Sequence, residues 1–313
     1  MADIYFSPAY GEIWAQTEQA EFKLFKYEKE NYQVVYPLLI RKIDATWQDV
    51  ISPYGYSGPL SNRIDPELYQ EFRLNFNNWC QQNHIVSEFI RFHPLLKNYQ
   101  EAEGSVKLIK RGETVWIDLK KPEKKLWQDL RKGHKGSIKK AQAAGMIIKP
   151  QTVDSIDKFY RLYQQTMERK DAKTYYHFNQ KFFNNHFDKL TDQVFWTGAF
   201  LKNKLVAGAM FLKKPPLIHY HFAASDAVAK NLSPGTLLIW ENILAAKKLG
   251  LTKFHLGGGI DDNLYFYKQG FSPLRADFYT GEKIHHPQVY NTLSRGKTNA
   301  DSGFFPLYRQ EKK

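Results

Sequence analysis

The amino-acid sequence predicts a two-domain α/β protein with mixed β-sheets. The chain has 313 residues, and a typical domain has about 150. In its second half, two helical patterns precede three strand-like runs, which are followed by helix, strand, helix and strand. Such strand–helix–strand alternation is typical of α/β domains. The first half shows a similar but less regular series of strands around one helix.

Spacing and turn residues mark the elements of the second half. Apolar residues from Asp154 to Lys170 fall on one helical face, and Asp154 is the expected N-cap. A second, short helix carries Phe182, Phe183, Phe187 and Leu190 on one side. The expected elements that follow are strands beginning at Val194, Leu205 and Leu217, a helix over Pro234–Leu249, a strand over Lys253–Leu256, a helix over Tyr265–Gln269 and a strand over Arg275–Tyr279.

The first half contains alternating or continuous apolar runs of strand length and one proline-started helix. A long basic helix over Pro122–Ala144 is expected to join the two halves, ending at Ala144-Gly145. The expected domains are therefore 1–145 and 146–290, with a tail, 291–313, packing on the first domain. The expected elements of the first half are strands over Phe22–Glu28, Tyr32–Ile40, Val86–Phe92 and Thr114–Leu119, and a helix over Pro66–Gln82.

Composition and charge limit the class of protein. Hydrophobic residues make up 42% of the chain, as in a globular protein, and the single cysteine, Cys80, cannot form an internal disulfide. No signal-peptide pattern or run of about 20 apolar residues is present, so we expect a cytoplasmic protein. The net charge is +13, and the segment 107–140 holds twelve Lys or Arg against four acids. This clustering favours a polyanionic partner or an anionic surface, although a basic face can also serve only solubility.

The segment KFHLGGGIDDNLYFYKQGFSP, residues 253–273, is the most distinctive in the chain. A strand ending in glycines and a following aromatic-Lys-x-Gly-Phe element resemble the Fem family of non-ribosomal aminoacyl transferases, within the GNAT acyltransferase superfamily. RFHPLL at 91–96, RKGHKGSIKKA at 131–141 and HYHFAAS at 219–225 extend the resemblance. The resemblance implies two tandem GNAT-like domains and amide-bond formation on a cell-wall precursor. It also implies aminoacyl-tRNA as the donor co-substrate and no resident cofactor.

One departure from the superfamily concerns the donor. Coenzyme-A-dependent GNAT enzymes bind pyrophosphate on a glycine-rich loop at a helix N-terminus. The corresponding stretch, Lys230–Gly235, holds one glycine and a proline that lacks an N–H. This favours a tRNA-type donor and leaves acyl-coenzyme A as the alternative. The coiled-coil arm of some Fem members is also absent from this sequence.

Acyl transfer to an amine requires a base, a positioned carbonyl and stabilisation of an oxyanion. The Fem resemblance places a functional lysine at Lys268, where a cation would stabilise developing charge and bind the tRNA end. His219 and His221 alternate on one strand and should share a face. A His-x-His pair also suits a metal, but no third ligand lies near it in sequence, so no metal is expected. The catalytic candidates are Lys268, His221, Glu241 and His255.

Further candidates bind substrate or phosphate. Tyrosines in the turn-rich loop 52–60 can stack on a sugar or peptide, arginine suits phosphate or carboxylate, and glycines allow close backbone approach. Each also has an ordinary packing, capping or turn role. The substrate-binding candidates are Tyr54, Tyr56, Arg91, His93, Arg169, Tyr176, His219, Ser225, Gly257, Gly258, Gly259, Asp262 and Tyr267. Phosphates of the tRNA acceptor arm are expected to contact Lys132, Lys135, Lys139 and Lys140.

Together these features predict an aminoacyltransferase that acts on an amine of a nucleotide- or lipid-linked peptidoglycan precursor. Peripheral contact with an anionic membrane surface is compatible with the charge, and no protein partner is implied. Two alternatives remain open. One is an acyl-coenzyme-A-dependent N-acyltransferase acting on an amino sugar or polysaccharide precursor. The other is a non-catalytic RNA-binding protein on the same scaffold.

Overall fold

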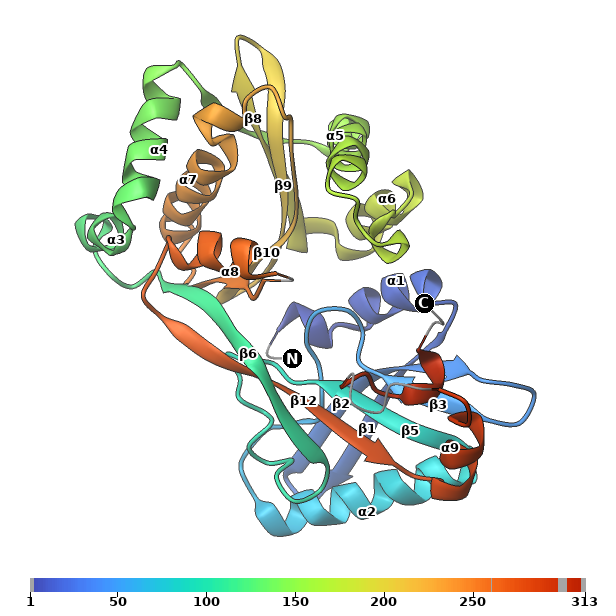
Figure 1. The fold of residues 1–313 in the computed structure, drawn as a ribbon. Helices are drawn as coiled ribbons and strands as arrows, with labels where there is room; N and C mark the ends of the chain where they lie inside the picture. The colour runs from blue at the N-terminus through green and yellow to red at the C-terminus, as the bar shows by residue number, and fades with distance from the viewer. Residues whose placement is uncertain (1–2, 260, 298–302, 311–313) are drawn as a thin grey trace. The chain divides into compact units, whose positions relative to one another are not determined.

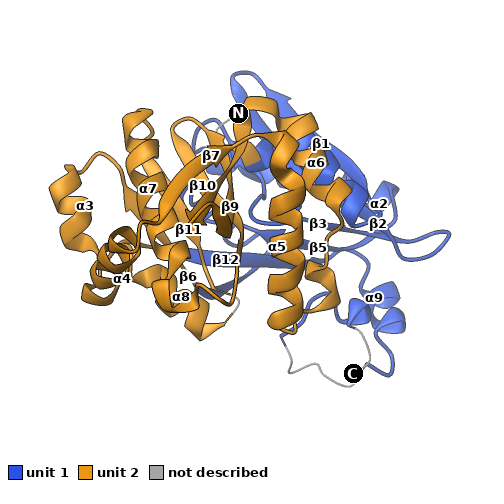
Figure 2. Cartoon of the chain, turned by 90° about the horizontal axis from the view of Figure 1, so that it is seen from above, with its two compact units in different colours: residues 1, 5–112, 277–313 blue, residues 2–4, 113–276 orange. Residues whose placement is uncertain are grey.

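The computed structural model describes residues 3–259, 261–297 and 303–310. The chain divides into two compact units, coloured separately in Figure 2: unit 1 comprises residues 5–112 and 277–313, and unit 2 comprises residues 2–4 and 113–276. The sequence placed the boundaries at 145/146 and 290/291, whereas the structure places them at 112/113 and 276/277. The cause is that the segment 113–145 contributes strand and helix residues to the core of unit 2.

Unit 1 is built on one mixed sheet. Its strands are β1 (Glu21–Lys29), β2 (Tyr32–Lys42), β3 (Gln48–Ile51), β4 (Leu60–Ser61), β5 (Ile85–Arg91), the first part of β6 (Lys107–Asp118) and the last part of β12 (Arg275–Ile284), and its helices are α1 (Pro8–Thr17), α2 (Pro66–Gln82) and α9 (Pro287–Leu293), with a 3-10 turn η7 (Leu307–Arg309). The strand order is β1-β2-β3-β5-β12-β6, with β4 on β2. Among the described strands of this unit, β3 and β5 run parallel, whereas β1–β2, β2–β3, β2–β4 and β5–β12 are antiparallel pairs. Figure 1 shows α2 along one face of this sheet and α1 on the other.

Helix α2 buries one apolar face against the sheet, as its sequence predicts. Asp65 caps it by accepting a hydrogen bond from the Leu68 N–H, and a proline occupies its first turn. Its buried side includes Phe72, Phe76 and the free thiol of Cys80. The face also carries one charged residue, Arg73, which is 2% exposed.

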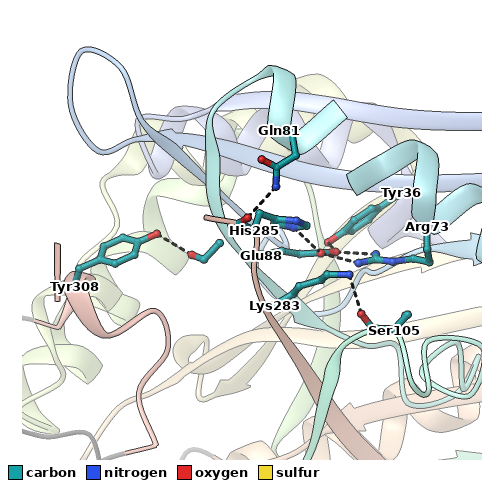
Figure 3. Close-up of polar contacts among 9 residues, drawn as sticks. Tyr36, Arg73, Gln81, Glu88, Ser105, Lys283, His285 and Tyr308 are labelled. Carbon is teal, nitrogen blue, oxygen red and sulfur yellow. Dashed lines mark hydrogen bonds and ion pairs between the residues drawn. The ribbon is translucent and has the colours of Figure 1, made fainter. Parts of the chain in front are cut away.

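Arg73 belongs to a buried polar network in unit 1, shown in Figure 3. Its guanidinium donates two hydrogen bonds to the Glu88 carboxylate on β5, at 3.0 and 2.8 Å. The same carboxylate accepts from the Tyr36 hydroxyl at 3.1 Å and lies 3.2 Å from His285 Nε2. Burial alone would raise the pKa of Glu88, but Arg73 and His285 hold it well below its usual value. Glu88 is therefore an ionised carboxylate inside the core.

The end of the chain lies on unit 1 where it is described. The Tyr308 hydroxyl is 2.7 Å from Ser87 Oγ and donates to Asp49 Oδ2 at 3.1 Å. Arg309 Nε donates to the same Asp49 carboxylate at 2.9 Å. These contacts tie the 3-10 turn to strands β3 and β5.

Unit 2 is built on the other part of the same mixed sheet, with helices on both faces. Its strands are the last part of β6, β7 (Ile147–Gln151), β8 (Val194–Leu201), β9 (Lys204–Lys214), β10 (Leu217–Ser225) and β11 (Lys253–Gly257), and its helices are α3 (Glu123–Asp129), α4 (Lys132–Ala143), α5 (Ile156–Arg169), α6 (Gln180–Leu190), α7 (Pro234–Lys248) and α8 (Asp262–Gln269). The strand order is β6-β11-β10-β9-β8-β7, in which β10 and β11 run parallel. Figure 1 shows α3, α4 and α7 on one side of this sheet and α5 and α6 on the other. The prediction of an α/β fold with mixed sheets is confirmed.

The main core of unit 2 lies between α7 and the sheet. Ile239 and Ile243 of α7 pack with Phe211 of β9 and Phe254 of β11, all at 0–1% exposure. The opposite face of the sheet holds an aromatic cluster in which Phe222 contacts Phe183 of α6. Burial on both faces explains why β9 reads as an almost continuous apolar run.

The prediction of one helix over Pro122–Ala144 is wrong, because the first helix ends at Asp129 and a second one follows. Leu130 and Arg131 adopt extended backbone conformations, and α4 starts at Lys132. The Arg131 N–H donates to the Gly270 carbonyl at 2.8 Å instead of to a preceding helical turn. A tertiary hydrogen bond therefore overrides the helical pattern at this point.

Other differences concern short or edge elements. The sequence did not predict α1, β3, β7 or α9. β7 contains Pro150, which is compatible with its position at the edge of the sheet but masks the strand pattern. Asp154 is not the N-cap of α5, since it lies in a 3-10 turn over Val153–Ser155 and Ser155 takes the cap position. In the part of the chain that the structure describes, no helix has the length and apolar character needed to cross a membrane.

Candidate active site

The parallel strands β10 and β11 separate at one point of unit 2. They pair at Leu217↔Lys253, Ile218↔Phe254 and His219↔His255, and the recorded pairing stops there. β10 continues to Ser225 along β9, whereas β11 ends at Gly257. The side chains and glycines around this fork form the candidate active site.

The glycine run after β11 has three different structural roles. Gly257 has a φ of +73°, a left-handed conformation that favours glycine. A Cβ on Gly259 would lie 2.5 Å from the Tyr265 amide nitrogen, so any side chain there would displace the start of α8. A Cβ on Gly258 would lie 3.3 Å from the Glu113 carbonyl oxygen. Close packing against α8 and β6 therefore accounts for the run before any ligand is considered.

Helix α8 begins directly after the glycines. Asp261 caps it by accepting a hydrogen bond from the Leu264 N–H at 2.7 Å. The candidate Asp262 is exposed in the first turn. At the other end of α8, the Arg131 N–H donates a hydrogen bond to the Gly270 carbonyl. The His134 ring packs so closely on Gly270 that a Cβ there would collide with the ring. Gly270 is thus required for the contact between α4 and α8.

Lys268 is the central charged residue of the fork. Its side chain is 8% exposed, and Nζ donates to the Gly258 carbonyl oxygen at 2.5 Å. Nζ also lies 5.7 Å from the centre of the Tyr220 ring. Burial lowers the pKa of Lys268 to about 8. The lysine is therefore a poorly solvated cation that is close to its titration point at neutral pH.

Two buried tyrosines lie near Lys268: Tyr220, whose ring faces its Nζ, and Tyr267, its neighbour in the sequence. Burial raises the pKa of Tyr267 to about 12, and its hydroxyl lies 3.4 Å from Thr236 Oγ1 at the start of α7. The Tyr267 carbonyl is 2.9 Å from His134 Nε2. Tyr220 is buried, and its pKa is raised well above the usual value by that burial. Both phenols stay protonated at neutral pH and can donate hydrogen bonds.

A chain of three buried groups lies at the last paired residues of the fork. His219 Nδ1 is 3.1 Å from His255 Nδ1, and His219 Nε2 is 2.8 Å from Asp3 Oδ2. Asp3, His219 and His255 are 0%, 1% and 1% exposed. The sequence named both histidines but not Asp3, which is 216 positions from His219 and has no motif around it.

His221 lies in a different environment from His219. A bulge between Tyr220 and Phe222 interrupts the pairing with β9, and the His221 ring packs 5.5 Å from His186 on α6. Burial, His186 and His219 lower the pKa of His221 well below its usual value. His221 is thus neutral at pH 7 and a weak base.

The remaining catalytic candidate, Glu241, lies on α7 and is half-buried. At the fork, Lys268 bonds to Gly258, and His219 bonds to His255 and Asp3. Glu241 takes part in none of these three hydrogen bonds. The neighbouring Asn242 is buried in the core, where it donates to Thr197 Oγ1 at 2.8 Å.

Three substrate-binding candidates lie at the end of α5, in the 3-10 turn after it and at the end of β10. The Arg169 guanidinium donates to the Ser225 carbonyl at 2.7 Å, linking α5 to the end of β10. The Tyr176 carbonyl accepts from the Tyr163 hydroxyl at 2.8 Å. Arg169 and Ser225 are therefore brought together, and Tyr176 is held separately by Tyr163.

The unit 1 candidates also have packing roles. Tyr54 stacks on Trp14 with ring centres 4.6 Å apart, and Tyr56 meets the His93 ring edge-on at 5.6 Å. Arg91 Nη1 donates to the Ser52 carbonyl at 3.1 Å. His93 is fully buried, and its Nδ1 accepts from the Leu96 N–H.

The basic helix presents most of its lysines to solvent. Lys132, Lys139 and Lys140 of α4 are exposed, and Lys135 is partly buried. Lys140 Nζ donates to the Asn231 carbonyl, and Lys135 Nζ donates to the Gln128 carbonyl, both at 2.9 Å.

Asn231 belongs to the stretch that would bind pyrophosphate in a coenzyme-A enzyme. There, Ser233 has a left-handed backbone and Pro234 opens α7. That helix start offers fewer N–H donors than a glycine-rich loop.

Comparison with known proteins shows what this fold and fork are similar to. Residues 128–269 match the acetyltransferase (GNAT) domain family. This stretch includes α4, the β8–β11 sheet, the glycine run and Lys268. Residues 128–269 are thus similar to a GNAT acetyltransferase domain, and the prediction of an acyltransferase is confirmed.

Solved structures extend the likeness to nearly the whole chain. The crystal structure of FemX superimposes with a TM-score of 0.69 at 12% identity, covering 90% of this chain and 92% of FemX. The C-terminal domain of a putative lysylphosphatidylglycerol synthetase from Agrobacterium fabrum gives 0.58 at 13% identity, covering 90% and 91%. L-PGS from Bacillus licheniformis gives 0.57 at 13% identity, covering 90% and 93%. The resemblance to Fem-type proteins is confirmed at the level of the fold, whereas no curated protein matches the sequence.

Proposed function

We propose that the protein transfers an aminoacyl group from aminoacyl-tRNA to an amine of a cell-wall or lipid precursor, forming an amide. The observation that carries this proposal is Lys268, whose buried cation is held at the glycine run where β10 and β11 separate. A cation in a poorly solvated site stabilises a developing oxyanion more strongly than one in water. The Fem-like fold, which spans both units, supports an aminoacyl donor.

The helix start at α7 also supports a donor other than coenzyme A. Ser233 and Pro234 replace the glycine-rich turn that would present several N–H groups to a pyrophosphate. The exposed lysines of α4 provide positive charge suited to a tRNA backbone instead. The acceptor is a precursor whose amine reaches the fork, and no resident cofactor takes part in this proposal.

The direct test is single-turnover transfer from total tRNA charged with radiolabelled amino acids to nucleotide- and lipid-linked precursors. Wild-type protein is expected to move label to a precursor. Lys268→Ala is expected to reduce the rate at least about 100-fold, because loss of one oxyanion-stabilising group has effects of this order. Lys181→Ala, on the exposed side of α6, is the matched control and should retain the wild-type rate. Unchanged transfer by Lys268→Ala would contradict the role of this lysine.

Acyl-coenzyme A is the second candidate donor, because residues 128–269 match an acetyltransferase domain. Acetyl-coenzyme A in a parallel reaction separates the two donors. A ligand that binds only the folded state stabilises it by about 2.7 kcal/mol at 100 times its Kd. Acyl transfer from acetyl-coenzyme A, together with a raised Tm and no transfer from tRNA, would replace the aminoacyl proposal. Binding of tRNA without transfer from either donor would favour the non-catalytic RNA-binding alternative.

The contribution of α4 to tRNA binding is tested by its salt dependence. Replacing Lys132 and Lys139 by alanine should weaken tRNA binding and reduce the slope of log K against log salt by about 1 for each phosphate that is no longer neutralised. A matched double variant, Lys158→Ala with Lys181→Ala, removes the same charge from exposed positions on α5 and α6. Equal slopes for the two double variants would show that α4 does not bind the phosphates.

A further inference from the structure

Phe266 is an exposed aromatic residue on α8, two positions before the buried Lys268. Its side chain is 62% exposed, whereas that of Lys268 is 8% exposed. Side chains two positions apart on a helix point about 200° away from each other, so Phe266 lies on the opposite side of α8 from Lys268. A single exposed phenylalanine is common on protein surfaces. The contacts of the ring therefore decide whether it has a role.

Arg131 stacks on one face of the Phe266 ring. Its guanidinium carbon lies 3.8 Å from the ring centre, the geometry of a cation–π contact. The backbone of Arg131 is fixed to the end of α8, because its N–H donates to the Gly270 carbonyl at 2.8 Å. Since Arg131 covers one face and the side chain is still 62% exposed, the other face of the ring is open to solvent.

The charge next to this pair is positive. The segment 131–144 holds Arg131 and four lysines and no acidic residue, and Lys132, directly after Arg131, is exposed. Proteins bind single-stranded nucleic acids with this combination, because bases stack on aromatic rings while neighbouring cations neutralise the phosphates. The combination of an open ring face and a basic segment therefore fits a single-stranded polynucleotide.

An anionic membrane would also attract this charge, but the helices lack the apolar face that membrane binding requires. A helix that lies in a membrane interface buries a continuous apolar face. In α4 and α8, both of which the structure describes in full, Phe266 is the only exposed large apolar side chain. One ring is enough to stack on a base, so the observations favour a nucleic acid.

We propose that Phe266 and Arg131 form a stacking platform for a nucleobase of the acyl donor, namely a base in the single-stranded 3′ end of tRNA. This platform rests on the proposed aminoacyl transfer. The base stacks on the open face of Phe266, Arg131 supports the ring from its other face, and the exposed lysines of α4 contact the phosphates. Because Phe266 and Lys268 belong to one short helix, a strand held on the platform brings its terminal ester near Lys268.

The first measurement compares two RNA hairpins that differ only in a single-stranded 3′ ACCA end. Phe266→Ala is expected to weaken binding of the hairpin that has this end by about 5- to 150-fold, the usual effect of losing one stacked base. Binding of the blunt hairpin should not change, because it depends on the phosphates. Leu249→Ala, which removes a 65% exposed apolar side chain of unit 2, is the matched control and should bind both hairpins like the wild type.

The second measurement separates stacking from charge. Phe266→Trp keeps an aromatic face and should retain affinity for the ACCA hairpin. Phe266→Ala removes no charge, so the slope of log K against log salt should equal that of the wild type. Arg131→Lys keeps the charge but loses the planar contact with the ring, and it should weaken binding of the ACCA hairpin without changing this slope.

Several outcomes would overturn the platform. Wild-type affinity of Phe266→Ala for the ACCA hairpin, or an equal loss for both hairpins, would show that no base of the 3′ end stacks on Phe266. A loss confined to vesicles of anionic phospholipid would show that the ring inserts into a membrane instead. Absence of binding of either hairpin and of acetyl-coenzyme A to the wild type would also contradict the proposal.

The remaining outcomes separate the platform from the proposed function. If the ACCA hairpin binds as expected but no label moves from charged tRNA, the transferase proposal fails and the platform stands. If the wild type binds acetyl-coenzyme A and not the hairpin, the tRNA assignment is overturned. Weaker binding of acetyl-coenzyme A by Phe266→Ala, with unchanged binding of acetyl-pantetheine, which lacks the adenine, would then assign the platform to the coenzyme's base.

Discussion

Between pH 8 and pH 10.5, the free energy of unfolding of the wild type is expected to rise by about 3 kcal/mol relative to Lys268→Met. The folded-state pKa of Lys268 is lowered from 10.5 to about 8 by burial, and a difference of one in pKa corresponds to about 1.4 kcal/mol. In this pH range the unfolded state holds a proton on Lys268 that the folded state has released. Stability therefore rises with pH until the unfolded lysine also deprotonates.

Chemical denaturation at pH 7.5, 9 and 10.5 measures this effect as the difference between wild type and variant. Titration of the other lysines and tyrosines is common to both proteins and largely cancels. Lys132→Met, at an exposed position of α4, is the matched control and should show no such pH-dependent difference. A constant difference between wild type and Lys268→Met would mean that the lysine is solvated and lacks a depressed pKa.

This prediction bears on function, because below pH 8 the buried cation destabilises the folded state. A methionine of similar length would remove that cost. Residues that reduce stability are common where activity needs an unfavourable charge or geometry. Greater stability of Lys268→Met than of the wild type below pH 8, combined with lost transfer in this variant, would show that the lysine serves catalysis and not the fold.

Glu88→Gln is expected to destabilise unit 1 by about 3–5 kcal/mol, because it leaves the buried Arg73 guanidinium without a counter-charge. Arg73 and Glu88 are 2% and 0% exposed and are joined by two hydrogen bonds. The lowered pKa of Glu88 means that this contribution is present at neutral pH and is lost only as strongly acid pH protonates the carboxylate. Denaturant unfolding at pH 7 measures the change.

Two comparisons separate a buried pair from an ordinary one. Glu71→Gln breaks an ion pair with Lys29 in which both side chains are 45% exposed, and its effect should be much smaller than that of Glu88→Gln. The double variant Arg73→Met with Glu88→Leu removes both charges and should recover much of the loss. Similar effects for Glu88→Gln and Glu71→Gln would contradict the burial argument.

The sequence was informative where local pattern and structure agree. Helix α2 has the predicted limits because Asp65 and Pro66 mark its start and Phe72 and Phe76 repeat on one face. The β8, β9 and β10 strands were identifiable from apolar runs between turn residues. The break at Leu130–Arg131 could not be predicted, since it depends on a hydrogen bond to Gly270, far along the chain.

The candidate site was predictable only in part, for the same reason. Lys268 could be chosen from its place in the aromatic-Lys-x-Gly-Phe element, but its burial depends on Tyr220 and the glycine run. His219 and His255 were visible as histidines on strands. Asp3 carried no signal, because its contact with His219 joins residues 216 positions apart. Nothing in the sequence around Arg73 marks it as buried, because its burial depends on Glu88, 15 residues further along the chain.

Unit 1 depends on strand β12, which is synthesised late, to complete its part of the sheet. It lies between β5 and β6 in unit 1, where Thr280 pairs with Arg91 and Ile284 with Ser87. The ribosome releases residues 5–112 long before these partners exist, so the early chain has an unfilled position in its sheet and an exposed β5 edge. The contiguous 113–276 stretch of unit 2 emerges in the meantime. Unit 1, although it comes first in the sequence, can be completed only when the last part of the chain has been made.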